Sequence, residues 1–269
     1  KSILPSFSKK VFIIAEVGIN HEGDYEKCCK LILQAKKSGA DAVKLQTIEP
    51  ELNYCEGSES FNIFQSSKLS KNETKKIFNF CKKNKIRIFT TFGDEKTMDW
   101  ILKLKPFGLK ISSGLLSNYP LVRKIISTSL PVFFSTGMAS KSDLFNIKKL
   151  IKKYKKKNVA ALHCISLYPT PKRYLNFDYI NYLKNYFKIP VGYSDHTRSQ
   201  EIPALSVLAG SVIVEKHFTF NENKQGFDHA ISFSSKRFTK MVKQIRKFEE
   251  YLIKDDFENI KKLQRLKFS

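Results

Sequence analysis

Polar, ionisable side chains follow short apolar runs at several places along this sequence. The stretch IIAEVGINHEGD, residues 13–24, passes from an apolar run to Glu16 and into a loop that contains glycine. An acid at that point marks either the exit of a strand from the core or part of a reactive site. One such residue would be unremarkable, so the choice between these two interpretations depends on the rest of the chain.

Lysines and hydroxyl-bearing residues recur at corresponding positions. Lys44, Lys110 and Lys216 each lie at or near the end of an apolar run. Lysines near hydroxyls form a site for phosphate or carboxylate, whereas buried lysines without an anion would repel one another and lose hydration. The hydroxyl-bearing residues at these positions are Thr90, Thr91, Ser112, Ser113, Ser135, Thr136, Ser166, Tyr168 and Ser194.

Two histidines follow neighbouring apolar runs late in the chain. His196 lies in VGYSDHT and His217 in VIVEKHFT, with Asp195 and Glu215 beside them. Two imidazoles brought close together suit a divalent transition metal. A lone histidine would more often hydrogen-bond its surroundings, but this pair with its acids favours a metal site.

The elements that must position these residues alternate between short apolar runs and longer amphipathic patterns. Apolar strands alternating with helices predict a parallel sheet covered by helices, and eight such units in 269 residues predict an α/β fold, the (β/α)8 TIM barrel. In such a barrel, chemistry lies at the carboxyl ends of the strands. The expected strands are residues 11–16, 42–46, 86–91, 108–112, 131–135, 159–164, 190–194 and 211–216. The expected helices lie near 25–38, 71–84, 94–104, 119–128, 141–156, 175–186, 199–209 and 235–252.

We expect one catalytic domain over residues 1–269, because no linker rich in proline or glycine divides the chain. Ser70 and Glu73 predict a capping box at one helix start. A terminal helix or a frayed end is expected for residues 255–269.

Composition narrows the class of protein. A hydrophobic content of 42% predicts a sizeable core, and no apolar stretch is long enough to span a membrane, so no membrane partner is expected. Five cysteines without a CxxC pair argue against a disulfide framework and favour a reducing, cytoplasmic location. Cys28 and Cys29 fall in a helical pattern as packing residues.

The net charge of +23 first suggests nucleic acid, but only seven of the 48 basic residues are arginines. Base-reading surfaces favour arginine, and these lysines are spread over nearly every expected helix. We therefore expect solvated helix faces, which can attract an anionic substrate, and no nucleic-acid partner.

Seven stretches resemble, in order, the sialic acid synthase family, which includes N-acetylneuraminate, legionaminate and pseudaminate synthases. They are IIAEVGINHEGD, GADAVKLQT, KISSG, STGMAS, LHCISLYPTP, VGYSDHT and VIVEKHFT, and the resemblance spans roughly residues 11–265. It implies a TIM barrel that condenses phosphoenolpyruvate with a 2-acetamido sugar aldehyde to give a nonulosonic acid. It also implies a divalent metal, usually Mn²⁺, and allows a homodimer.

The resemblance implies roles for twelve residues. Glu16 resembles the acid/base carboxylate, and His196 and His217 resemble the metal ligands. The residues that resemble phosphoenolpyruvate ligands are Lys44, Thr91, Lys110, Ser113, Ser135 and Ser194. Those that resemble sugar contacts are Gln46, Tyr168 and Asp228.

Three features depart from the family pattern. Leu115 stands where an acid often grips sugar hydroxyls, so we expect a preference for a 6-deoxy, 2,4-diacetamido sugar over N-acetylmannosamine. Phe227 replaces the proline of GPDHA, so the loop near Asp228 is expected to differ. Family members usually carry a C-terminal antifreeze-like domain, and we expect residues 1–269 to form the barrel domain without it.

Two alternatives stay open at this point. A 3-deoxy-ulosonate synthase that uses a phosphorylated sugar has related chemistry, although the YPTP motif argues against it. A barrel that binds a sugar without catalysis is suggested by Leu115, although Glu16, His196 and His217 are all retained.

Overall fold

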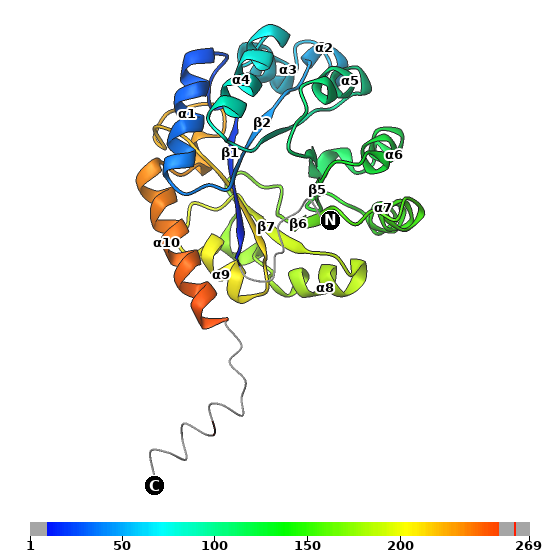
Figure 1. Cartoon of the computed structure of the whole chain (residues 1–269), viewed down its shortest axis with the longest axis vertical. Helices are drawn as coiled ribbons and strands as arrows, with labels where there is room; N and C mark the ends of the chain where they lie inside the picture. The colour runs from blue at the N-terminus through cyan, green and yellow to red at the C-terminus, as the bar shows by residue number, and fades with distance from the viewer. Residues whose placement is uncertain (1–9, 253–260, 262–269) are drawn as a thin grey trace.

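The computed structural model describes residues 10–252 and 261, and this part of the chain forms a closed barrel of parallel strands (Figure 1). Each strand pairs with the next along the chain, and β8 pairs with β1 to close the ring. The expected (β/α)8 fold is therefore confirmed, and residues 255–269 lie outside the described residues apart from Lys261. The strands are β1 (Phe12–Gly18), β2 (Ala42–Gln46), β3 (Ile88–Thr91), β4 (Leu109–Ile111), β5 (Val132–Ser135), β6 (Val159–His163), β7 (Val191–Asp195) and β8 (Ile213–His217).

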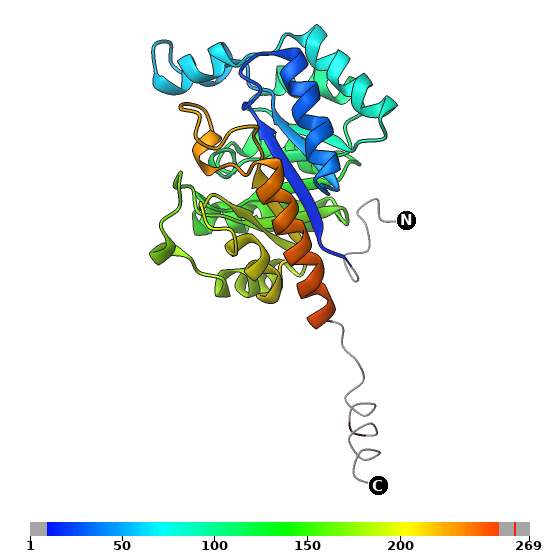
Figure 2. The same ribbon diagram turned by 90° about the vertical axis from the view of Figure 1, so that its left-hand side faces the viewer.

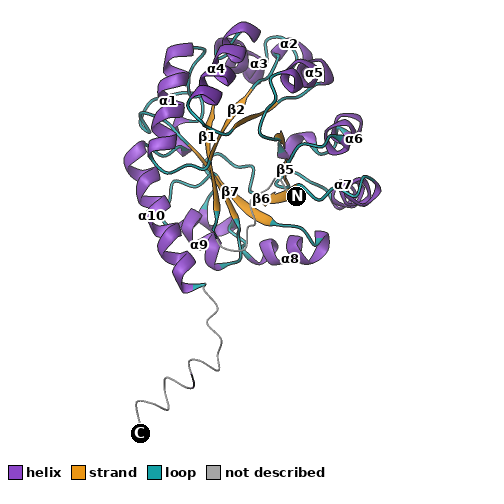
Figure 3. Cartoon of the chain, in the orientation of Figure 1, coloured by secondary structure: helices purple, strands orange, loops and turns teal. Residues whose placement is uncertain are grey.

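Helices surround the barrel as an outer layer (Figure 3). The eight expected helices form within a few residues of their predicted bounds. They are α1 (Tyr25–Lys37), α4 (Lys71–Lys83), α5 (Glu95–Lys103), α6 (Tyr119–Ser127), α7 (Lys141–Lys153), α8 (Asp178–Phe187), α9 (Ile202–Leu208) and α10 (Ser235–Tyr251). The capping box at the start of α4 is also present, since the Ser70 hydroxyl accepts from the Glu73 N–H and the Glu73 carboxylate accepts from the Ser70 N–H.

Two short helices between β2 and α4 were not expected. They are α2 (Pro50–Asn53) and α3 (Glu59–Ser66). Each is too short to show a helical period of apolar residues, and α3 has no buried residue. Local capping starts α3, because the Ser58 hydroxyl accepts from the Phe61 N–H.

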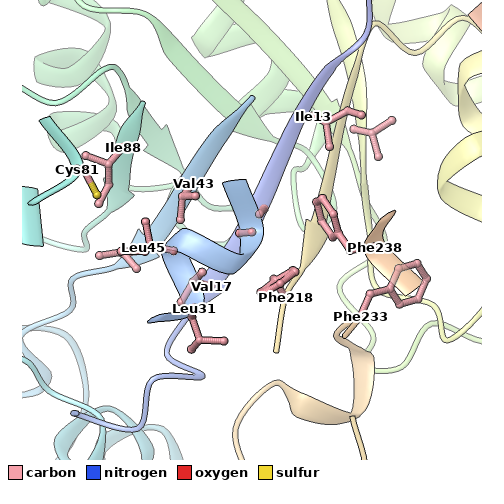
Figure 4. Close-up of a cluster of buried hydrophobic side chains, with 14 of the residues drawn as sticks. Ile13, Val17, Leu31, Val43, Leu45, Cys81, Ile88, Phe218, Phe233 and Phe238 are labelled. Atoms are coloured by element: carbon pink, nitrogen blue, oxygen red, sulfur yellow. The ribbon is translucent and has the colours of Figure 1, made fainter. Parts of the chain in front are cut away.

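The core lies in two places because successive strand residues point to opposite faces. Outward residues pack against the helices, as in the cluster around β1, β2 and β8 (Figure 4). That cluster includes Ile13, Val43, Leu31 and Phe238, and Cys28 and Cys29 pack there as expected.

The inward residues form an apolar floor and a polar layer above it. Phe12, Phe89 and Phe133 stack across the floor, with 5.1 Å between the ring centroids of Phe89 and Phe133. β7 approaches β8 so closely that a Cβ on Gly192 would lie 2.4 Å from the Ile213 carbonyl oxygen. The polar layer lies towards the carboxyl ends of the strands and holds the predicted site residues.

None of the helices in the described part of the chain has the length and apolar character needed to cross a bilayer.

Candidate active site

Two adjoining cavities open at the carboxyl ends of the strands, on the side where the segments that follow β2, β6 and β8 gather (Figure 2). The inner cavity measures about 170 Å³ and the outer cavity about 330 Å³. Eleven of the twelve predicted site residues line the inner cavity, and Asp228 lines the outer cavity. Gln46, Tyr168 and His217 line both, so the structure brings all twelve together. The eleven are Glu16, Lys44, Gln46, Thr91, Lys110, Ser113, Ser135, Tyr168, Ser194, His196 and His217.

A buried ion pair joins β1 to β2. The Lys44 Nζ lies 2.6 Å from Glu16 Oε2, and the Gln46 amide donates to Glu16 Oε1 at 3.0 Å. The register places Glu16 beside Lys44. Burial raises the pKa of Glu16 and the nearby carboxylate of Glu215 adds to the rise, against the opposing charge of Lys44. Glu16 is thus a buried carboxyl group that binds a proton more tightly than an exposed one.

A second buried ion pair joins β4 to β8 across the barrel. The Lys110 ammonium donates to both carboxylate oxygens of Glu215, at 2.8 and 3.0 Å, and the Ser194 hydroxyl donates to the same carboxylate at 2.9 Å. Although burial alone would raise the pKa of Glu215, Lys110 and Lys44 bring it to about 2. Burial lowers the pKa of Lys110.

Glu215 lines the inner cavity, although we predicted no role for it from the sequence. Its signal was available, because Glu215 stands two residues before His217 on one strand, and residues two apart share a face.

The hydroxyl-bearing residues complete the inner cavity. The Thr91 hydroxyl donates to the Lys110 carbonyl at 3.1 Å, and the Ser113 and Ser166 hydroxyls lie 2.8 Å apart. Ser135 ends β5 and is buried on the same inner face. These groups surround the two lysines with donors of the kind that bind phosphate or carboxylate oxygens.

The two predicted metal ligands lie side by side at the rim of the inner cavity. Their ring centroids are 5.7 Å apart. His196 Nδ1 lies 2.9 Å from the Ile165 carbonyl oxygen, which can only accept, so His196 donates there and its Nε2 keeps a lone pair. His217 Nδ1 is buried without a hydrogen-bond partner and lies 3.5 Å from Asp228 Oδ2.

The protonation of these histidines suits metal binding. Burial lowers the pKa of His196 to about 4, and burial together with His196 lowers the pKa of His217 well below its usual value. Neutral imidazoles are the form that binds a metal. Within residues 10–252 and 261, no three His, Cys, Asp or Glu side chains form a metal cluster by themselves. The pair therefore fits a metal only if other ligands complete it.

Lys216 does not belong to the anion site, and that expectation was wrong. Its side chain points to the outer face of the barrel, where the ammonium lies 2.6 Å from Asp195 Oδ2 and 2.6 Å from the Thr197 carbonyl oxygen. Both members of this ion pair are fully buried. Asp195 immediately precedes His196 and Lys216 immediately precedes His217. The ion pair therefore joins β7 to β8 next to the two histidines.

Asp228 and Tyr168 border the outer cavity. Burial raises the pKa of Asp228 to about 7, and the negative charge of Glu16 adds to the rise, against Lys44. The Tyr168 ring lies over His196 with 4.3 Å between the ring centroids. These groups, with Gln46, give the outer cavity both acceptors and donors.

Two of the three departures from the family pattern fall on described residues, and their outcomes differ. Leu115 packs against the apolar cluster that includes the buried residues of α6, and it lines neither cavity, so the sugar preference expected from it has no support in its position. Phe227 lines the outer cavity with a φ of +49°. The ring of proline fixes φ near −65°, so a proline could not adopt this backbone conformation. The loop therefore differs from one with proline at this position, as expected.

The fold and the cavities define a TIM barrel with a deep, charged site at the carboxyl ends of its strands. The family model described as the NeuB family matches residues 31–256, and the chain belongs to that family. An uncharacterized protein of Methanocaldococcus jannaschii is 40% identical over 90% of this chain and 72% of its own length. The N,N'-diacetyllegionaminic acid synthase of Legionella pneumophila is 32% identical over 91% of this chain and 74% of its own.

Solved structures agree with this assignment. N-acetylneuraminic acid (sialic acid) synthetase from Leptospira borgpetersenii, in complex with citrate, is 31% identical and superposes with a TM-score of 0.89, over 95% of this chain and 91% of that one. A truncated 3-deoxy-D-arabino-heptulosonate 7-phosphate synthase from Thermotoga maritima has a TM-score of 0.72 at 13% identity, over 91% of this chain and 88% of that one. The second likeness concerns the fold alone.

Proposed function

We propose that this protein condenses phosphoenolpyruvate with the open-chain aldehyde of a 2-acetamido sugar, giving a nonulosonic acid and phosphate. The observation that carries the proposal is the pair of adjoining cavities: a deep one with two buried lysines and a wider one with a carboxylate and an amide. Membership of the NeuB family supports the same reaction class.

The inner cavity is the proposed phosphoenolpyruvate site. Lys44 and Lys110 are buried and each is paired with a carboxylate, so both ammonium groups are oriented before a ligand arrives. A phosphate or carboxylate group would take over part of these contacts and add the hydroxyls of Ser113 and Ser135. Charged hydrogen bonds of this kind are stronger than neutral ones.

His196 and His217 are the proposed ligands of a divalent metal, with Mn²⁺ as the expected ion. When bound there, such an ion would act as a Lewis acid on the sugar aldehyde. Two nitrogen ligands leave the remaining positions to substrate oxygens and water, in keeping with an open catalytic site. The Asp228 carboxylate, 3.5 Å from His217 Nδ1, stands where it can orient that ring.

Glu16 is the proposed acid/base. Carbon 3 of phosphoenolpyruvate would form a bond to the aldehyde carbon, water would add at carbon 2, and the bond from carbon 2 to the phosphate oxygen would break. The raised pKa of Glu16 allows it to accept the proton of that water and return it to an oxygen of the intermediate. Cytoplasmic location and a homodimer stay predictions of the sequence.

The experiment combines the protein with phosphoenolpyruvate, Mn²⁺ and a panel of 2-acetamido sugars, 2,4-diacetamido sugars and phosphorylated sugars without an acetamido group, and follows phosphate release and product mass. We expect release only with both a sugar and the metal, and a product mass equal to the sum of phosphoenolpyruvate, sugar and water less phosphate. With ¹⁸O in the bridging position, the label should leave in phosphate. Release only with a phosphorylated sugar that has no acetamido group would favour a 3-deoxy-ulosonate synthase. Binding without turnover would favour a sugar-binding barrel.

A further inference from the structure

The turn after β1 contains a side chain that the proposed reaction does not use. Asn20 is fully buried in the stretch INHEGD. Its amide donates to the Phe218 carbonyl at 3.0 Å and to the Ser232 hydroxyl at 2.8 Å, and its oxygen accepts from the Asp228 N–H at 3.1 Å. The amide therefore satisfies both of its N–H donors and its oxygen, all on the segment that follows β8.

These bonds converge on the backbone of one residue. Asn20 holds the N–H of Asp228, and the Ser232 hydroxyl donates to the Asp228 carbonyl at 2.5 Å. Because Ser232 also accepts from Asn20, the three residues form a closed ring of hydrogen bonds. Asp228 is held through both of its backbone polar groups while its carboxylate is left to face the outer cavity.

The next residue along the segment is anchored from the same turn. Glu22 Oε1 lies 3.0 Å from His229 Nε2, and His229 Nδ1 lies 2.7 Å from the Thr219 hydroxyl. Glu22 also pairs with Lys27 of α1 and with Lys224, so its carboxylate is fixed by three partners. Asn20 and Glu22 thus hydrogen-bond to two successive residues, Asp228 and His229.

The segment needs such an anchor. Between β8 and α10 its only helical element in the described chain is the single turn His229–Ile231. Gly226 and Phe227 precede Asp228 with φ of +81° and +49°, and the second value is unfavourable for a residue with a side chain. Such conformations persist where the surrounding structure over-determines them.

We propose that Asn20 and Glu22 are positioning residues that set the place of Asp228 at the acceptor-sugar site. The inference rests on the proposed function, because it assigns the sugar to the outer cavity. It does not involve the inner cavity, since neither Asn20 nor Glu22 lines it. Losing the anchor should therefore impair the sugar and spare phosphoenolpyruvate.

The kinetic test compares Asn20→Ala, Ser232→Ala and Glu22→Ala with the parent protein. We expect the KM for the sugar to rise and kcat to fall, together about ten- to a hundredfold in kcat/KM for Asn20→Ala, since a shift of about 1 Å can cost that much. Ser232→Ala should change less in the same direction. Calorimetry should give a phosphoenolpyruvate affinity within about twofold of the parent. Glu22→Gln keeps an acceptor for His229 and should restore most of the loss seen in Glu22→Ala.

The matched control is Ser206→Ala. Ser206 is also fully buried, and its hydroxyl donates to the Pro203 carbonyl in α9, away from both cavities. It should alter thermal stability without changing the KM for either substrate. An equal loss for sugar and phosphoenolpyruvate in Asn20→Ala, or no loss for either, would overturn the proposal.

Hydrogen exchange followed by mass spectrometry separates this inference from the proposed function. In Asn20→Ala, amides of residues 219–232 should exchange at least about tenfold faster than in the parent, while those of β3 and β4 should not change. Unchanged exchange in 219–232 would refute the anchor whatever the reaction. Faster exchange in a protein whose parent turns over no sugar would retain the anchor and reject the proposed function.

Discussion

Each lysine of the inner cavity already has a carboxylate partner: Glu16 for Lys44 and Glu215 for Lys110. Breaking one such buried pair leaves an uncompensated charge, which costs more than the pair itself contributes. A single substitution there changes stability and ligand affinity together. The two effects have to be separated by replacing both partners.

Lys110→Met should lower the free energy of unfolding by about 3–5 kcal/mol, because it leaves the buried Glu215 carboxylate unpaired. Adding Glu215→Gln should recover most of that stability. The double variant should still bind phosphoenolpyruvate about ten- to a hundredfold more weakly, through the loss of a charged contact of roughly 1.5–3 kcal/mol. Chemical denaturation and calorimetry measure the two quantities, and unchanged affinity in the double variant would remove Lys110 from the site.

His196→Ala and His217→Ala should each abolish Mn²⁺ binding, because each removes one of the two nitrogen ligands that we propose. The free Mn²⁺ signal in electron paramagnetic resonance reports this without turnover. His163→Phe is the control, since His163 packs between Tyr179 and Tyr193 on the outer face of β6. If both alanine variants bind Mn²⁺ as the parent does, the assignment is wrong.

At the scale of the elements, strand alternation decides which polar residues meet. The barrel could be predicted because apolar runs of this length alternate with amphipathic helices, and the place of Lys44 and Lys110 in the site because chemistry in such a barrel lies at the carboxyl ends of the strands. Residue type alone could not separate Lys216 from those lysines. It lies one position from His217 on the strand and so faces outward, into an ion pair with Asp195 of the neighbouring strand β7. Helices α2 and α3 escaped prediction because they are short.

Gly192→Ala tests the close approach of β7 and β8. The added Cβ would lie 2.4 Å from the Ile213 carbonyl oxygen and 2.5 Å from its Cβ, in backbone that cannot move without opening the barrel. We expect a loss of more than about 3 kcal/mol in the free energy of unfolding, or an insoluble protein. Gly114→Ala is the control, since its nearest neighbour would be the Met138 sulfur at 3.7 Å. Equal stability of the two variants would show that β7 and β8 do not approach each other this closely.

At the scale of the whole molecule, the histidines share one property. The chain has five, all are buried, and the pKa of each is lowered, chiefly by burial. They are His21, His163, His196, His217 and His229. The folded state therefore excludes protons that the unfolded chain binds near pH 6.5.

The free energy of unfolding should fall as the pH drops from 6.5 towards 4. In this range the histidines of the unfolded chain take up protons, whereas those of the folded protein, with their lowered pKa values, stay neutral. Each histidine contributes at most about 1.4 kcal/mol per pH unit in that window. The raised pKa values of Asp228 and Glu16 act in the opposite sense and reduce the slope without reversing it. Urea denaturation of chelator-treated protein at pH 7.5, 6 and 5 measures the slope, and a flat profile would refute it.

The stacked phenylalanines of the floor give the barrel a closed end. Among the described residues, Phe12, Phe89 and Phe133 lie beneath the lysines and fill that end of the barrel, so we expect ligands to reach the inner cavity from the side of the outer cavity. Where two ligands share one entrance, the ligand that enters first leaves last. Phosphoenolpyruvate would be locked in once the sugar arrives, and phosphate would follow the sugar acid out. Labelled phosphoenolpyruvate chased with sugar and excess unlabelled compound should therefore be committed to product.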